Sequence, residues 1–254
     1  MYFNKGGRHH WFAKNLIGLG YNPTIFCANT RHNSRDVIEI HQGKHINREA
    51  ENIPYLFVKT SCYTGNGISR IRNIIRFYKN LFPVAKEYSK THGKPDIILA
   101  SSVHPLALVA GIKIAKKFKI PCICEVRDLW PESLVAYGRL GEKSLIAKLL
   151  YQGEKWIYKK ADRLIFTMEG GKDYIIDKGW DKEHGGPVDI DKVHHINNGV
   201  DLEEYDYNKE HYVTVDEDLN NNHVFKVIYA GAIRRTNQIE TIINSARYLK
   251  EKKN

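Results

Sequence analysis

Three ionisable side chains stand where apolar runs of the sequence give way to polar turns. His104 follows the run at residues 95–100, and Arg127 and Asp128 follow the run at residues 121–126. Ligands of parallel α/β sheets bind at the carboxyl ends of the strands, so these positions predict a binding site. Arg127 would bind a phosphate or carboxylate, Asp128 would accept a hydrogen bond, and His104 would contact a hydroxyl. The alternatives are a His104 that only caps its strand and an Arg127–Asp128 ion pair that holds the loop.

Two further sites for an anion are suggested near the ends of the chain. Gly6 and Gly7 precede an amphipathic segment, where unpaired backbone N–H groups at a helix start would accept a diphosphate or a phosphorylated acceptor. The alternative is a flexible N-terminus. Arg234 and Arg235 stand between an apolar run and another amphipathic segment, and they would bind a phosphate or form a solvated basic turn.

Apolar runs alternate with amphipathic segments along most of the chain. The spacing of apolar residues predicts helices over residues 7–19, 68–89, 105–118, 143–160 and 237–250. It predicts strands over residues 23–28, 55–58, 95–100, 121–126, 163–167, 193–196 and 224–230. This order indicates an α/β fold with a Rossmann-like parallel sheet and helices on both faces. The polar residues 29–51 predict an exposed loop.

The predicted elements divide the chain into one domain and part of another. Residues 1–205 are expected to form the first domain, and residues 206–223 a polar connector. Residues 224–254 supply one strand and one helix, which predicts the start of an incomplete second Rossmann domain. A helix that begins near residue 7 is normally preceded by a buried strand in this fold, so we expect the first strand to be missing.

Charge and hydropathy limit the classes of function. No run is long enough to span a membrane and no signal peptide precedes the first helix, which predicts a cytoplasmic protein. The net charge of +10 calls for an anionic partner. On the helix over residues 68–89, Arg72, Arg76 and Lys79 form a basic arc that would either contact an anionic membrane or face solvent. No nucleic-acid-binding motif is present, so nucleic acid is not an expected partner.

The cysteines and paired histidines indicate structural roles. Cys122 and Cys124 lie two apart in an apolar run, so both thiols are expected on one face of a strand as reduced residues. No metal site is expected, because neither of the histidine doublets, residues 9–10 and 194–195, presents both rings to one ion from a regular helix.

Five blocks of the sequence resemble, in order and at plausible spacings, bacterial glycosyltransferase family 4. The similarity is to its capsule and lipopolysaccharide branch, which includes N-acetylfucosaminyltransferases. The blocks are Gly6-Gly7-Arg8-His9, Ala100-Ser101-Ser102-Val103-His104-Pro105, Glu125-Val126-Arg127-Asp128-Leu129-Trp130-Pro131-Glu132-Ser133, Asn198-Gly199-Val200-Asp201 and Tyr229-Ala230-Gly231.

The resemblance implies a GT-B architecture of two Rossmann domains. The N-terminal domain would hold the acceptor and the C-terminal domain most of the nucleotide-sugar, and transfer would retain the anomeric configuration without a metal or other cofactor. By this resemblance the catalytic residues are His104, Arg127 and Asp128. The implied substrate-binding residues are Gly6, Gly7, Arg8, His9, Glu132, Asn198, Gly231, Arg234 and Arg235.

The expected function is therefore that of a retaining glycosyltransferase in surface polysaccharide biosynthesis. It would move a sugar from a nucleotide-sugar to a lipid-linked saccharide acceptor at the inner face of the cell membrane. The sequence lacks the family's paired glutamates and its diphosphate-binding Lys and Arg. The alternative is accordingly a truncated, non-catalytic remnant or subunit that binds an acceptor or a partner chain only.

Overall fold

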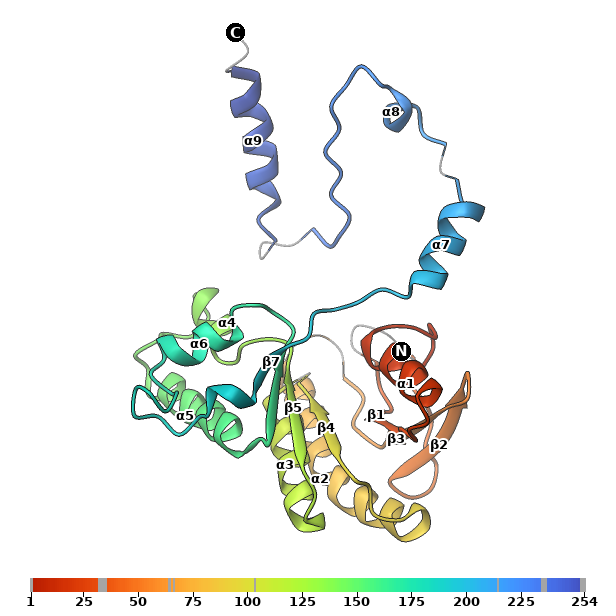
Figure 1. Ribbon diagram of the computed structural model, residues 1–254, viewed down its shortest axis with the longest axis vertical. Helices are drawn as coiled ribbons and strands as arrows, with labels where there is room; N and C mark the ends of the chain where they lie inside the picture. The colour runs from red at the N-terminus through yellow and green to blue at the C-terminus, as the bar shows by residue number, and fades with distance from the viewer. Residues whose placement is uncertain are drawn as a thin grey trace. The chain divides into compact units, whose positions relative to one another are not determined.

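The computed structural model describes residues 2–31, 36–63, 65, 67–102, 104–213, 215–233 and 237–251. The chain divides into two units, Met1–Gly199 and Val200–Asn254, which appear in Figure 1 with the first unit from red to teal and the second in blue. The first unit contains both sheets and every hydrophobic cluster described below.

The first sheet of this unit has three strands in the order β1-β3-β2. Strand β3 (Ile53–Val58) pairs in parallel with β1 (Ile25–Ala28) and antiparallel with β2 (His45–Ala50). The prediction of a loop over residues 29–51 is therefore wrong for β2. Glu51 and Asn52 both have positive φ, which makes a two-residue hairpin turn without the usual Asn-Gly signal. Strand β2 is polar because it forms the edge of the sheet.

Alternate residues of β3 face two different helical layers, as the period of a strand requires. Ile53, Tyr55 and Phe57 pack with Ala13 of α1 (Arg8–Gly18). Residues 56 and 58 pack instead against α2 (Ile68–His92) and α3 (Pro105–Phe118). Helices therefore cover both faces of this sheet.

The second sheet is parallel throughout and has the order β4-β5-β6-β7. Its strands are β4 (Ile98–Ser101), β5 (Cys122–Val126), β6 (Arg163–Phe166) and β7 (Val193–His195). This parallel sheet with flanking helices confirms the predicted α/β fold class. Cys122 and Cys124 lie on one buried face with their Sγ atoms 4.0 Å apart, as predicted.

Helix α3 lies between α2 and α5 (Leu145–Lys160) on one face of the sheets (Figure 1). A Cβ at Gly111 would lie 2.4 Å from the Cβ of Ala100 in β4, so only glycine permits this close packing. Helix α5 begins two residues later than predicted because Ser144 is its N-cap and accepts a hydrogen bond from the N–H of Ala147.

The two sheets are not joined by strand pairing among the described residues. Strands β1 and β4 each pair with one neighbour, β3 and β5 respectively. Leu99 in β4 is 40% exposed, which is unusual for a strand of a parallel sheet. The expectation that a first strand is missing stays a prediction.

Several short helices of the first unit were not predicted, because they are close to or below the length at which periodicity is recognisable. They are α4 (Glu132–Ala136), α6 (Gly171–Asp177) and the 3-10 helix η1 (Ile190–Lys192). Among the described residues, no helix is long and apolar enough to cross a membrane.

The second unit contains the helices α7 (Leu202–His211), α8 (Glu217–Asn220) and α9 (Ile239–Glu251). Helix α9 confirms a predicted helix. Helix α8 lies wholly, and α7 partly, in the segment over residues 206–223 that was predicted to be a polar connector. The strand predicted over residues 224–230 is wrong, because the structure assigns no strand to those residues. Phe225 there is 93% exposed, and an apolar run becomes a strand only when it pairs with a neighbour.

Candidate functional site

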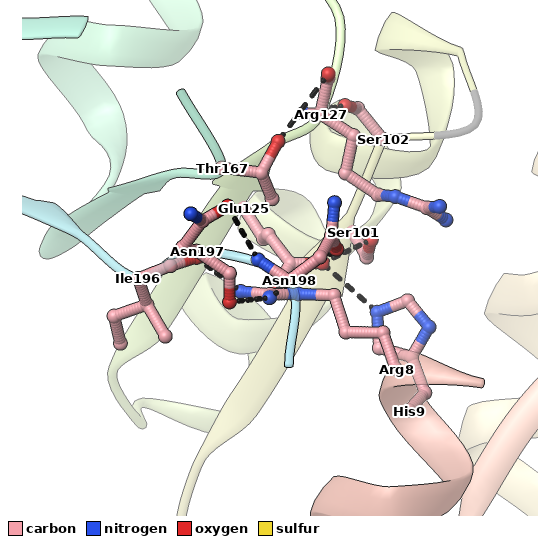
Figure 2. Close-up of polar contacts among 10 residues, drawn as sticks. All are labelled: Arg8, His9, Ser101, Ser102, Glu125, Arg127, Thr167, Ile196, Asn197 and Asn198. Atoms are coloured by element: carbon pink, nitrogen blue, oxygen red, sulfur yellow. Dashed lines mark hydrogen bonds and ion pairs between the residues drawn. The ribbon is translucent and has the colours of Figure 1, made fainter. Parts of the chain in front are cut away.

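The centre of the candidate site is the carboxylate of Glu125, which is fully buried near the carboxyl end of β5. Its Oε1 accepts a hydrogen bond from Nε of Arg8 at 2.7 Å. Its Oε2 accepts from Nε2 of His9 at 2.9 Å and from Oγ of Ser101 at 2.6 Å. Figure 2 shows these three donors converging on one carboxylate from α1 and β4.

The remaining guanidinium nitrogens of Arg8 bind the segment that follows β7. Nη2 donates to the carbonyl of Ile196 at 2.8 Å, and Nη1 donates to the carbonyl of Asn197 at 2.6 Å. Oδ1 of Asn198 lies 3.5 Å from the same Nη1 (Figure 2). The guanidinium also stacks over Phe12 at 4.6 Å. Arg8 therefore connects α1, β5 and the chain after β7 through one buried side chain.

Helix α1 can place Arg8 and His9 here because of the residue that precedes it. Gly7 is the N-cap of α1 and has a backbone φ of 97°, which residues other than glycine rarely adopt. The predicted Gly6-Gly7 pair thus starts the helix whose first two side chains enter the cluster. Binding of an anion by these glycines stays a prediction.

Glu125 is held as an anion by its partners. Burial alone would raise the pKa of Glu125, but the hydrogen bonds from His9, Ser101 and Arg8 outweigh burial and lower the pKa to about 2. Glu125 therefore carries a fixed negative charge at neutral pH, and the Arg8 cation is bound directly to it.

Neighbouring strand ends are tied together beside this cluster. Oγ of Ser102 accepts a hydrogen bond from the backbone N–H of Arg127 at 2.9 Å. Thr167 Oγ1 lies 3.4 Å from the carbonyl oxygen of Arg127 (Figure 2). The Arg127 side chain is half-buried and Asp128 is exposed, and no ion pair joins the two in the part of the chain that the structure describes. The loop is held by its backbone, which leaves the guanidinium available for a ligand.

His104 is the N-cap of α3, and one nitrogen of its ring, Nδ1, is buried without a hydrogen-bond partner among the described residues. Burial and the nearby charge of Arg70 lower the pKa of His104 to about 4, so the ring is neutral at physiological pH. A neutral imidazole with an unpaired nitrogen is suited to a hydrogen bond with a hydroxyl group.

Other predicted site residues are not part of this cluster. Glu132 accepts a hydrogen bond from Tyr151 and forms a 2.8 Å ion pair with Lys178, which fixes α4 to α5 and the end of α6. Gly231 belongs to the second unit. Arg234 and Arg235 lie outside the described residues.

The residue that organises the cluster, Glu125, was not among the predicted site residues. A glutamate within the apolar run of β5 was the available signal, because a buried carboxylate requires a partner. Ser101 and the backbone of Asn197 gave no such signal.

A second buried polar cluster lies where β1 and β3 end. Oδ1 of Asn29 accepts hydrogen bonds from the N–H and Oγ1 of Thr60 at 2.8 and 2.9 Å. Nδ2 of Asn73 in α2 donates to Thr60 Oγ1 at 3.0 Å and to the carbonyl of Ser61 at 2.6 Å. These contacts fix the first turns of α2 to the carboxyl edge of the first sheet.

The described residues include no group of three or more His, Cys, Asp or Glu that could hold a metal ion. The histidine doublet of α1 has other partners. His9 binds Glu125, while His10 contacts the hydroxyl of Tyr55 at 2.7 Å and Glu51 at 3.0 Å.

A known family model covers most of the chain. The model of Glycosyltransferase Family 4 matches residues 10–204, which is most of the chain. The chain belongs to glycosyltransferase family 4. Glu125 and the strand ends around it lie inside the matched region, whereas Arg8 and His9 lie just before it.

Among solved structures, the family 4 chain is similar to a sucrose-phosphate synthase from Thermosynechococcus elongatus, at 15% identity and a TM-score of 0.48. The match covers 81% of this chain and 47% of the synthase, so the chain spans about half the length of that protein. No curated protein matches the chain significantly.

Proposed function

We propose that this chain is the acceptor-side part of a retaining glycosyltransferase that moves a sugar from a nucleotide-sugar to a saccharide acceptor. The observation that carries the proposal is the convergence of the chemically active residues at one edge of the sheets. Arg8 and His9 reach Glu125, and Arg127 follows the same strand as Glu125. Membership of family 4 supports the same chemistry.

Each group has a role that its environment suits. Glu125 stays ionised and orients Arg8 and His9. His104 stays neutral and half-buried, and its imidazole would hydrogen-bond a sugar hydroxyl. In sugar transfer, negative charge develops on the departing diphosphate, and Arg127 would stabilise it. Asp128, which is exposed, would accept a hydrogen bond from the acceptor hydroxyl.

The nucleotide-sugar would be bound mainly by a second Rossmann domain in a GT-B arrangement, and no metal would be required. Residues 224–254 would contribute the first part of that domain, including Gly231, Arg234 and Arg235. We therefore expect transfer from a protein in which this chain is joined to a donor-binding domain. A non-catalytic role in binding acceptor or partner is the alternative if no such protein is active.

The acceptor we propose is a lipid-linked saccharide of surface polysaccharide biosynthesis, in the capsule and lipopolysaccharide branch of the family. The enzyme would act in the cytoplasm at the inner face of the cell membrane. Support comes from the net charge of +10, which favours an anionic surface, and from the sequence blocks shared with that branch.

The test is an assay of sugar transfer with a panel of nucleotide-sugars, using a protein in which this chain is joined to a donor-binding domain. Arg127→Ala is expected to lower kcat by about 10²- to 10³-fold, the usual effect of removing one group that stabilises transition-state charge. Arg163→Ala is the matched control, because Arg163 is an exposed arginine at the start of β6, at the opposite edge of the sheet. Absence of transfer from every nucleotide-sugar would contradict the proposal.

A further inference from the structure

The positive charge of the chain is concentrated in one helical layer. Helices α2, α3 and α5 together contain 13 Lys and Arg residues and two Glu residues. One of the two, Glu154, is 4% exposed and contributes little to the surface. The excess of positive over negative residues in this layer is larger than the net charge of the whole chain, which is +10. The rest of the molecule is therefore close to neutral.

The same layer exposes large aliphatic side chains in the first turns of two of its helices. In α5, Leu145 is 82% exposed, Ile146 63% and Leu149 72%. In α2, Ile68 is 70% exposed and Ile71 55%. Single exposed aliphatic residues are ordinary on protein surfaces, but groups of this kind on two helices of one layer mark an interaction site.

Lysines lie beside the aliphatic stripe of α5. Lys148, Lys155 and Lys159 are spaced by seven and four residues, so they share one side of the helix. They lie between the exposed aliphatic stripe and the buried face that packs on α3 and the sheet. An exposed aliphatic stripe flanked by lysines is the pattern of a helix that lies in the interface of an anionic bilayer.

The exposed aliphatic residues lie at the same edge of the sheets as the candidate site. Helix α2 follows β3, and α5 follows β5 after the short α4, so both begin near the carboxyl ends of parallel strands. The hydrogen bonds of Asn73 hold the first turns of α2 at that edge. Figure 1 shows α2, α3 and α5 as adjacent helices that run along the sheets.

We propose that the outer surface of α2, α3 and α5, here called the docking face, binds an anionic lipid bilayer. Leu145, Ile146 and Leu149 would enter the headgroup region, and the lysines of α5 would contact lipid phosphates. A lipid surface explains the aliphatic exposure, whereas a nucleic acid duplex is bound through contacts between its phosphates and Lys or Arg and leaves the aliphatic exposure unexplained. The proposal rests on the proposed function only for its purpose, which is to bring the carboxyl edge to a lipid-linked acceptor.

The test is co-sedimentation of the 254-residue chain with large vesicles of 70% phosphatidylcholine and 30% phosphatidylglycerol. The chain is expected to pellet with these vesicles and to remain in solution with vesicles of phosphatidylcholine alone. Leu149→Gln is expected to weaken partitioning several-fold, and Leu145→Gln with Leu149→Gln by roughly tenfold or more, because apolar burial in the bilayer is lost. Both side chains are exposed, so neither substitution affects the core.

Leu19→Gln is the matched control, because Leu19 is 74% exposed, lies at the end of α1, and α1 packs on the opposite face of the first sheet. This variant should pellet as the wild type does. Equal losses in Leu19→Gln and Leu149→Gln, or no preference for phosphatidylglycerol, would overturn the proposal. So would binding of a DNA duplex that is as strong in Leu149→Gln as in the wild type, combined with no sedimentation.

The outcome for the docking face is separable from the outcome for catalysis. Vesicle binding without sugar transfer would leave the docking face standing and remove the proposed function. Transfer to a water-soluble acceptor analogue without vesicle binding would support the proposed function and remove the docking face. With a soluble acceptor, Leu149→Gln is expected to transfer sugar at the wild-type rate.

Discussion

Two buried glutamates of the first unit differ sharply in the state of their carboxyl groups. Glu125 on β5 and Glu154 on α5 are 0% and 4% exposed, and each accepts short hydrogen bonds. The donors to Glu125 include the guanidinium of Arg8, and the pKa of Glu125 falls to about 2. The donors to Glu154 are the hydroxyls of Tyr158 and Tyr174 at 2.6 and 2.8 Å. Burial raises the pKa of Glu154 to about 7, and the two tyrosines offset this only in part.

The difference shows what a buried carboxylate needs in order to remain ionised. The hydrogen bonds from His9, Ser101 and Arg8 together outweigh the burial of Glu125. Two tyrosine hydroxyls do not outweigh the burial of Glu154, even with the charge of Lys178 nearby. The charge of Lys178 lowers the pKa of Glu154, but the ammonium group of Lys178 forms its ion pair with Glu132. The cluster of Glu125 therefore carries fixed charges at the candidate site, while that of Glu154 holds α5 and α6 together and titrates near neutral pH.

The largest expected effect comes from removing the cation of the first cluster. Arg8→Met leaves Glu125 buried without the cation of its ion pair, so the free energy of unfolding should fall by about 3–5 kcal/mol. Urea denaturation measures this. The double variant of Arg8→Met with Glu125→Gln should lose less than the sum of its single changes, because it leaves no unpaired charge. A loss below about 1 kcal/mol for Arg8→Met would mean that the ion pair does not hold the charge.

Glu154 should make the free energy of unfolding depend on pH between the unfolded and folded pKa values of its carboxyl group. The folded-state pKa of about 7 lies above the unfolded value of 4.5. The stability contributed by the neutral carboxyl is thus fully present below pH 4.5 and lost as pH rises through about 7. The loss should reach about 3 kcal/mol above pH 8. Glu154→Gln should remove this slope and be more stable than the wild type at pH 8, as measured by urea denaturation at pH 5 and pH 8.

A smaller effect is expected from the hydroxyl donor to Glu125. Ser101→Ala removes a hydrogen bond to a charged acceptor and should cost about 1.5–3 kcal/mol. The lowered pKa of Glu125 contributes stability above pH 4.5 that is lost as pH falls toward 2. Because the variant is less stable above pH 4.5, its acid-unfolding midpoint should lie at higher pH than that of the wild type. Acid titration followed by circular dichroism measures the midpoint. An unchanged midpoint would count against the role of Ser101.

The smallest effect is expected at the corresponding donor to Glu154. Tyr174→Phe removes one hydrogen bond and should cost about 1 kcal/mol at pH 5, where the Glu154 carboxyl is neutral. It should also raise the pKa of Glu154 further above 7, because the hydrogen bond from Tyr174 lowers that pKa. The pH dependence of unfolding in this variant tests the direction. A shift toward lower pH would contradict the assignment of Tyr174 as a donor.

The sequence predicted the parts of the fold that have strong local patterns. Apolar runs such as that of β5 and long amphipathic segments such as α2 formed the expected elements. Strand β2 was not predicted, because it is a polar edge strand closed by a Glu51-Asn52 turn without glycine. The run at residues 224–230 has the right composition for a strand, but pairing with a partner decides whether a strand forms.

The candidate site was predicted in part. Arg8 and His9 were placed at a site by the blocks they belong to, although their actual partner is the unpredicted Glu125. Glu132 was placed in the same block as Arg127, yet it binds Lys178. Sequence shows which strand ends are chemically active, but which side chains meet depends on long-range pairing that no local pattern contains.

The central claim is that Glu125 is a permanent anion that orients Arg8 and His9 at the edge where we propose sugar transfer occurs. The most direct test is an NMR titration of the side-chain carboxyl carbons of Glu125 and Glu154, assigned with the Gln variants. We predict that Glu125 remains ionised down to the acid limit of the folded state while Glu154 titrates near pH 7. Titration of Glu125 at or above its unfolded value of 4.5 would contradict the claim.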